Sequence, residues 1–177
     1  MRTFAELPVP FQCVAASIER AAERWFSEGD LLEAVLASCA VPGLLPPVLI
    51  DGEHHLDGGL VHSIPVGRAV ALGADTVYVL HVGRIDRPLR PPTRPWEVAL
   101  VAFEIARRHR FAADLAALPL GVTLHVLPSG EPAAPSAADL RNLRYRAVSG
   151  VPDRIDRAYG AARRYLDRSA AAADGAA

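Results

Sequence analysis

The strongest structural signal in this sequence is the segment Leu44–Gly59. Two prolines enforce an extended backbone there, and the apolar run Val48–Ile50 has the length of a strand. Asp51-Gly52 can adopt the positive φ angles of a two-residue hairpin turn, so a returning strand is expected at Glu53–Leu56. The return ends in Asp57-Gly58-Gly59. Glycines at that point permit a backbone path that side chains would block and let another group approach closely.

Strand-length apolar runs alternate with helical patterns along the chain. Asp30 can cap a helix that ends near Val41–Gly43, and Glu33 has the spacing of a capping box. The runs 76–82 and 121–127 are nearly all apolar, as in strands covered on both faces. We therefore predict an α/β fold with helices on both faces of the sheet.

The remaining elements follow from shorter patterns. A strand is expected at Cys13–Ala15, and the charged stretch Ser17–Arg24 tolerates a helix. Further helices are expected at 66–72, closed by Gly73, at 96–118, and from about Pro152 onward. In the last of these, one stripe carries Ile155, Tyr159, Ala162 and Leu166.

Composition excludes several classes of protein. A chain of 177 residues suits one compact domain, and an apolar content of 51% excludes global disorder. The formal charge of −1 leaves no basic excess to neutralise phosphates, so we expect no nucleic-acid partner. Two cysteines cannot build a disulfide framework. Met1–Glu6 has no apolar leader, and no run reaches the roughly 18 apolar residues of a membrane span. A cytoplasmic protein, or one peripheral at a membrane, is expected.

Asp57 is the strongest candidate for chemistry. A carboxylate on a Gly-Gly turn at the end of a strand can act as a general base or as a metal ligand. The simpler alternative is that Asp-Gly is only a turn, as it is at Asp51-Gly52 six residues earlier. Spacing alone favours the turn.

A metal site is a weaker alternative. His54, His55 and Asp57 are close in sequence, but neighbouring strand residues point to opposite faces, so only His55 and Asp57 share a side. A third ligand would have to be brought in by folding from one of the other histidines: His62, His81, His109 or His125. Two ligands without a spaced partner set do not define a zinc site.

The candidate nucleophiles are poorly placed. Ser38 lies at the C-terminal end of a helix, whereas a nucleophilic serine needs a strand-to-helix turn with a helix start beside it. Cys39 is on an apolar stripe with no histidine tied to it locally. His81 and His125 lie inside apolar strands and are expected to be hydrogen-bonded core residues.

Several stretches together resemble the bacterial patatin-like phospholipases. They are ASCAVPGLLPPV (residues 37–48), the Asp-Gly hairpin, and LDGGLVHSIPV (residues 56–66), in that order. Supporting stretches are FAELPVPFQCVAA (residues 4–16), FSEGDLLEAV (residues 26–35), RAVALGADTVYVLHVGR (residues 68–84) and LPSG (residues 127–130). The similarity is taken to run from about Phe4 to the last helix. It predicts that residues 1–168 are the C-terminal portion of a patatin domain and that residues 169–177 are a disordered tail.

The resemblance implies a three-layer α/β/α sheet that lacks its N-terminal strands, and hydrolysis of lipid acyl esters by a Ser-Asp dyad. Asp57, followed by Gly58 and Gly59, matches the aspartate motif. Its implied role is the general base that takes the proton of the attacking serine, with no histidine between them. The serine motif Gly-x-Ser-x-Gly is absent, because no two glycines lie four apart around a serine. The resemblance implies no cofactor and no metal.

The expected partners follow from that family. They are a phospholipid or other acyl ester substrate, a transient membrane surface, and an N-terminal segment or partner chain that completes the sheet. Without a serine and oxyanion donors, acyl transfer by this chain alone should be near background. The alternative is a catalytically inactive, truncated relative that binds lipid or protein.

Overall fold

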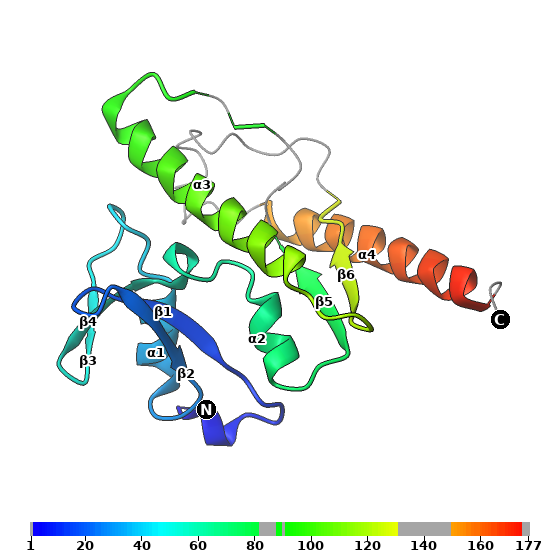
Figure 1. The fold of residues 1–177 in the computed structure, drawn as a ribbon, viewed down its shortest axis with the longest axis horizontal. Coiled ribbons are helices and arrows are strands. Elements are labelled where there is room, and N and C mark those ends of the chain that lie inside the picture. The colour runs from blue at the N-terminus through cyan, green and yellow to red at the C-terminus, as the bar shows by residue number, and fades with distance from the viewer. Residues whose placement is uncertain (1, 82–87, 90, 131–149, 175–177) are drawn as a thin grey trace. The chain divides into compact units, whose positions relative to one another are not determined.

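The computed structural model describes residues 2–81, 88–89, 91–130 and 150–174 (Figure 1). The chain forms two compact units, where the sequence predicts one. The first unit contains Met1–Pro65 and Ala102–Ala117, and the second contains Val66–Val101 and Leu118–Ala177. The first unit is therefore discontinuous in sequence, because a later stretch of helix joins its N-terminal part.

The first unit is built on an antiparallel sheet of order β2-β1-β4-β3. Its strands are β1 (Cys13–Ser17), β2 (Ala22–Phe26), β3 (Val48–Ile50) and β4 (Glu53–Asp57). Between β3 and β4, Asp51 and Gly52 have φ angles of 51° and 81°, both in the left-handed region. The hairpin predicted from this segment is therefore confirmed.

The stretch Ser17–Arg24, which the sequence marks as helix-tolerant, is a second hairpin. Strand β2 pairs antiparallel with β1, with Cys13 opposite Phe26 and Ser17 opposite Ala22. Ala21 has a φ of 48° in the turn. Pairing with a buried strand outweighs the weak helical preference of a short charged segment, since local propensity is a small energy term.

One face of this sheet is covered by α1 (Leu31–Ser38). Asp30 caps the helix, because its Oδ1 accepts a hydrogen bond of 2.9 Å from Glu33 N–H, as the sequence predicts. The buried cluster between helix and sheet consists of Phe4, Ala15, Phe26, Ala34 and Ala37. Short 3-10 turns lie at Phe4–Glu6 (η1) and Gly58–Leu60 (η2).

Helix α3 (Pro95–Ala116) divides between the two units, and its residues from Ala102 onward belong to the first. The second unit contains α2 (Val66–Ala71), the parallel pair β5 (Thr76–Leu80) and β6 (Thr123–Leu127), and α4 (Val151–Asp174). Mixed α/β content, with four α-helices in the described ranges, agrees with the predicted class.

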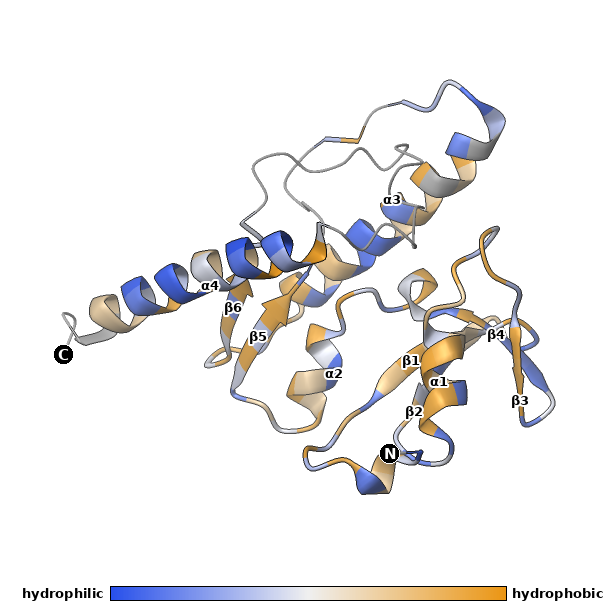
Figure 2. Cartoon of the chain, turned by 180° about the vertical axis from the view of Figure 1, so that it is seen from behind, coloured by the Kyte–Doolittle hydropathy of each residue, from blue (hydrophilic) through white to orange (hydrophobic). Residues whose placement is uncertain are grey.

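Strand β5 differs from the expectation of burial on both faces. Val77 and Val79 are buried, whereas Tyr78 and Leu80 are 53% and 78% exposed. Figure 2 shows β5 and β6 as hydrophobic through most of their length. An apolar run reports that a strand is hydrophobic but cannot report how many of its faces are covered.

Helix α4 includes part of the segment expected to be a tail, because it continues through Asp174. Residues 175–177 lie outside the described part of the chain. On the stripe named above, Ile155 and Tyr159 are more than half exposed. Within the described ranges, no helix is both long enough and apolar enough to cross a bilayer.

Candidate functional site

Asp57 is the last residue of β4, at the point where the sheet meets η2. Ala15 of β1 lies opposite it in the sheet. The backbone N–H of Asp57 donates to the Ala40 carbonyl at 2.9 Å. Its side chain turns back on the chain, since Oδ1 accepts a 2.6 Å hydrogen bond from Gly59 N–H and so caps η2. The carboxylate is therefore held by both the strand and the turn.

The two glycines after Asp57 are required by close contacts. A Cβ on Gly58 would stand 2.0 Å from the Val14 carbonyl oxygen, which no side chain can tolerate. A Cβ on Gly59 would stand 2.9 Å from Asp57 Oδ1 and 3.0 Å from Phe103 Cζ. Glycine is thus what lets the turn press against β1 while the carboxylate folds over it.

Two side chains of α3 border the same turn. Besides Phe103, the Cδ of Arg107 would lie 3.6 Å from a Cβ on Gly59. Arg107 Nε donates to Ser63 Oγ at 2.6 Å, and its Nη1 pairs with Glu104 Oε2 at 2.9 Å. The Arg107 side chain is therefore anchored beside the Asp57 turn.

These surroundings set the protonation of Asp57. Burial raises its pKa above the usual value, and the Gly59 N–H bond and the positive charge of Arg107 counter that rise only in part. A carboxylate with a raised pKa accepts a proton more readily than an ordinary surface aspartate, which is the property a general base needs.

The two histidines of β4 point to opposite sides of the sheet, as predicted. The His55 ring is fully buried, 5.5 Å from the Phe26 ring, and neither ring nitrogen has a hydrogen-bond partner. His54 is exposed, with Nδ1 2.6 Å from Glu19 Oε1. Among the described residues, no three His, Cys, Asp or Glu side chains are grouped so that they could hold a metal ion.

The Cys39 thiol lies close enough to Asp57 to feel its charge. Partial burial of the thiol raises its pKa, and the negative charge of Asp57 adds to that rise. Ser38 is the last residue of α1. Cys39 is exposed overall, and the raised pKa favours its protonated thiol near neutral pH.

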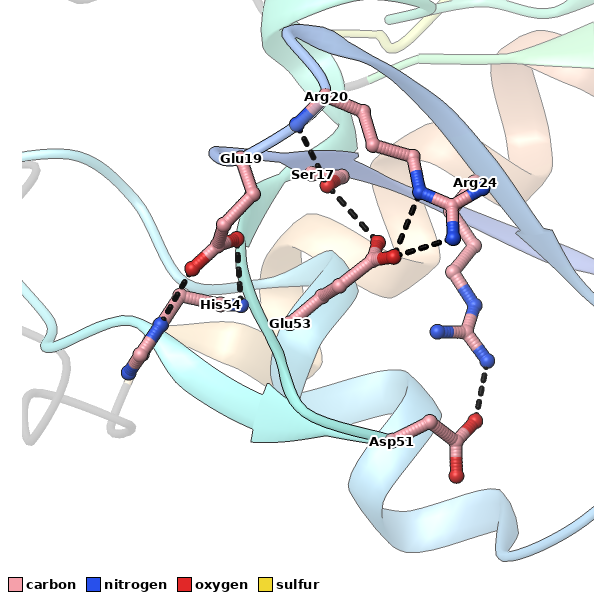
Figure 3. A network of polar contacts seen from close by, with 7 residues as sticks. All are labelled: Ser17, Glu19, Arg20, Arg24, Asp51, Glu53 and His54. Carbon is pink, nitrogen blue, oxygen red and sulfur yellow. Dashed lines mark hydrogen bonds and ion pairs between the residues drawn. The ribbon is translucent and has the colours of Figure 1, made fainter.

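A polar network covers part of the sheet around β4 (Figure 3). Ser17 Oγ donates to Glu53 Oε2 at 3.0 Å, Arg20 pairs with Glu53, and Arg24 pairs with Asp51. A surface hollow of about 370 Å³ is lined by Ser17, Arg20, Glu23, Arg24, Asp51 and Glu53. Each pair has one well-exposed partner, Arg20 or Asp51, so these paired charges form a solvated face rather than a reactive centre.

A second cluster, which the sequence analysis missed, surrounds His62. The ring is nearly buried, with Nε2 2.5 Å from Glu23 Oε2 and 2.9 Å from Arg110 Nη2. On its other side, Nδ1 lies 3.6 Å from Asp114 Oδ2. The members come from β2, the stretch after η2, and α3, so no local sequence pattern could have joined them.

Part of the sequence is similar to a known protein family. Residues 3–70 match the family model of patatin-like phospholipases. That segment contains β1 to β4, α1 and the whole Asp57 turn. It ends inside α2, so β5, α3, β6 and α4 lie beyond it.

Curated relatives match the same part of the chain. The lysophospholipase nte1 of Emericella nidulans is 37% identical over 76 residues, which are 43% of this chain and 5% of that protein. The lysophospholipase nte1 of Aspergillus niger is 36% identical over 76 residues, again 5% of its length. An uncharacterized NTE family protein of Mycobacterium tuberculosis is 34% identical over 70 residues, which are 40% of this chain and 19% of that protein.

These matches correct the predicted extent of the resemblance. The expectation that residues 1–168 form the C-terminal portion of a patatin domain is wrong, since the patatin-like match is confined to residues 3–70. The specific motifs all lie between residues 37 and 66. The supporting stretches at residues 68–84 and 127–130 lie mostly beyond the match, and their strand and helix patterns are ones that other α/β proteins share.

Proposed function

We propose that this chain contributes the general base of a patatin-like acyl hydrolase that acts on phospholipid esters. Asp57 is the base, and Gly58 and Gly59 shape the turn that holds it. The observation that carries the proposal is a half-buried carboxylate with a raised pKa, placed on a glycine turn inside the patatin-like segment.

The proposed reaction proceeds in two steps. A serine hydroxyl attacks the ester carbonyl while its proton passes to Asp57, and the alcohol leaves with that proton when the ester C–O bond breaks. Water then attacks the acyl-serine, again losing a proton to Asp57, and the fatty acid departs as the serine regains its hydrogen. No histidine takes part in the proposed reaction, because the His55 ring packs against Phe26 and His54 pairs with Glu19.

The attacking serine is supplied by polypeptide outside these 177 residues. The sequence holds no Gly-x-Ser-x-Gly, and two serines near the site bond elsewhere, Ser17 to Glu53 and Ser63 to Arg107. A base contributes about 10²–10⁴-fold only when a nucleophile is within hydrogen-bond reach. The chain alone is therefore expected to hydrolyse esters near the background rate.

The proposed substrate class is that of the two fungal relatives, both of which are lysophospholipases by name. A single-chain phospholipid ester is therefore the first substrate to test. A membrane surface, as the source of such lipids, is the setting we propose for the reaction.

Ester hydrolysis by two proteins tests the proposal. One is the 177-residue chain, and the other is the product of its reading frame extended upstream of the first codon. Each is assayed with lysophosphatidylcholine and with a p-nitrophenyl acyl ester, as wild type and as Asp57→Asn. The exposed Asp51→Asn, at the other Asp-Gly turn, is the matched control.

We expect the extended protein to hydrolyse both substrates, to lose about 10²-fold or more with Asp57→Asn, and to keep its rate with Asp51→Asn. Equal hydrolysis with asparagine at position 57 would refute Asp57 as the base. An extended frame without a nucleophile motif and without hydrolysis would instead favour a lipid- or protein-binding remnant.

A further inference from the structure

The contacts of α3 with the Asp57 turn extend the candidate site beyond the patatin-like segment. Phe103 and Arg107 lie more than thirty residues after position 70, yet both border the point where a Cβ on Gly59 would stand. These residues belong to the same compact unit as Asp57. The family match therefore omits part of what surrounds the carboxylate.

Arg107 is held in place from two directions. Ser63, six residues after Asp57, accepts from Nε at 2.6 Å, and Glu104, one turn earlier on α3, accepts from Nη1 at 2.9 Å. The side chain also lies near the Phe103 ring, with Cζ 5.8 Å from its centroid. A long side chain fixed at this many points loses little entropy when it presents its charge to a neighbour.

The groups around Asp57 act in opposite directions on its charge. Burial disfavours the ionised form of the carboxylate, and the Cys39 thiol carries no positive charge that would offset this effect. Gly59 N–H and Arg107 favour the ionised form. Glu104 partly neutralises Arg107, so the cation acts with less than its full charge. Of these groups, Arg107 is the one whose charge a conservative substitution can remove.

We propose that Arg107 is a positioning residue for Asp57: anchored by Ser63 and Glu104 beside the glycine turn, its guanidinium favours the charged form of the carboxylate that Gly59 N–H holds in place. This inference rests on the proposed function, because it assigns α3 a part in preparing the base. It adds a residue outside the matched segment to the candidate site.

Titration of Asp57 in the full 177-residue chain tests the inference without any need for turnover. The carboxyl carbon of 13C-labelled aspartate, assigned through Asp57→Asn, is followed by NMR in wild type and in Arg107→Gln. We expect Arg107→Gln to raise the pKa of Asp57 by about 0.5 to 1, because an opposing charge is lost. Arg107→Lys should restore most of the wild-type value.

Arg108→Gln is the matched control. Arg108 is the next residue on the same helix and pairs with the same partner, through Nε and Glu104 Oε1 at 2.9 Å. It is expected to leave the pKa of Asp57 unchanged. Should Arg107→Gln fail to fold by circular dichroism, Ser63→Ala, which loosens the anchor and keeps the charge, is expected to raise the same pKa by a smaller amount.

An unchanged Asp57 pKa in both Arg107→Gln and Ser63→Ala, or an equal rise in Arg108→Gln, would overturn the inference. In the upstream-extended enzyme, the acidic limb of the pH–rate profile should move upward in Arg107→Gln by the rise measured by NMR. Activity that survives Asp57→Asn would reject the proposed function while leaving the NMR result intact, so the two failures are distinguishable.

Discussion

At the level of single residues, the Asp57 turn depends on two glycines, because each of them lacks a Cβ. Gly58 brings the turn into contact with the β1 backbone, and Gly59 leaves room for the carboxylate to reach back to its own turn. Asp51-Gly52 is an Asp-Gly turn of a different kind, since positive φ angles and not close contacts require its glycine.

This difference predicts unequal costs of adding one methyl group. Gly58→Ala should lower the free energy of unfolding by about 3 kcal/mol, because its Cβ meets a backbone carbonyl that cannot move aside. Gly52→Ala, with open space around it but a φ of 81°, should cost about 1 kcal/mol. Urea unfolding of both variants measures the difference, and equal costs would contradict the close contact at Gly58.

The raised pKa of Asp57 predicts that folding stability depends on pH at this residue. Between the ordinary value of 3.8 and the raised folded value, the native state binds more protons than the unfolded state. Stability therefore falls as pH rises through that window, and the ionised carboxylate costs stability above it. Asp57→Asn should consequently stabilise the chain more at pH 7 than at pH 3.

Denaturant unfolding at the two pH values measures this effect, with Asp51→Asn as the exposed control. A stabilisation by Asp57→Asn of the same size at pH 3 and pH 7 would show that ionisation of this carboxyl costs the fold nothing. A gain in stability on removing this carboxylate would fit its proposed role, because groups placed for function often cost stability.

At the level of helices and strands, the elements of the patatin-like segment form from local sequence signals. A helix that lies later in the sequence, α3, then packs against the Asp57 turn. The hairpin β3–β4 and helix α1 follow from turn and cap residues within their own sequence. Helix α3 contributes Phe103 and Arg107 to the Asp57 turn, and Arg110 and Asp114 to the His62 cluster. The first unit therefore depends both on local turn and cap residues and on contacts with a helix far away in the sequence.

The cap of α1 gives a direct test at this scale. Asp30→Ala removes the acceptor for Glu33 N–H and should lower the free energy of unfolding by about 1 kcal/mol. Asp30→Asn keeps an acceptor oxygen at the same place and should lose only a few tenths. Thermal and urea unfolding provide the measurement, and a loss as large in Asp30→Asn would mean that the charge, rather than the hydrogen bond, stabilises the helix.

At the scale of the whole molecule, the family match and the compact units do not coincide. The match ends at residue 70, but the first unit also contains Ala102–Ala117. Those residues supply partners to His62 and Ser63, which lie just after the Asp57 turn. The segment that carries the family likeness is thus not the segment that forms a unit.

A fragment comparison follows from this mismatch. Residues 1–117, which contain the whole first unit, should protect the Gly59 amide from hydrogen exchange about as well as the full chain does. Residues 1–70, which lack the α3 contacts, should lose about tenfold or more of that protection. Exchange measured by NMR separates the cases, and equal protection in the shorter fragment would show that α3 is dispensable to the turn.

The local features of this protein can be predicted from its residues alone: the β3–β4 hairpin, the Asp30 cap, and the position of Asp57 at the end of a strand before two glycines. Each of these depends on residues close together in the chain, where φ preferences and side-chain hydrogen bonds act directly.

The folded chain was needed to reveal four other features: the β1–β2 hairpin, the His62 cluster, the single covered face of β5, and the contacts of α3 with the Asp57 turn. The His62 cluster and the α3 contacts join residues tens of positions apart, and their energies come from burial and charge pairing between segments. Local propensity is blind to such contacts, because the same helix or strand pattern is compatible with many partners.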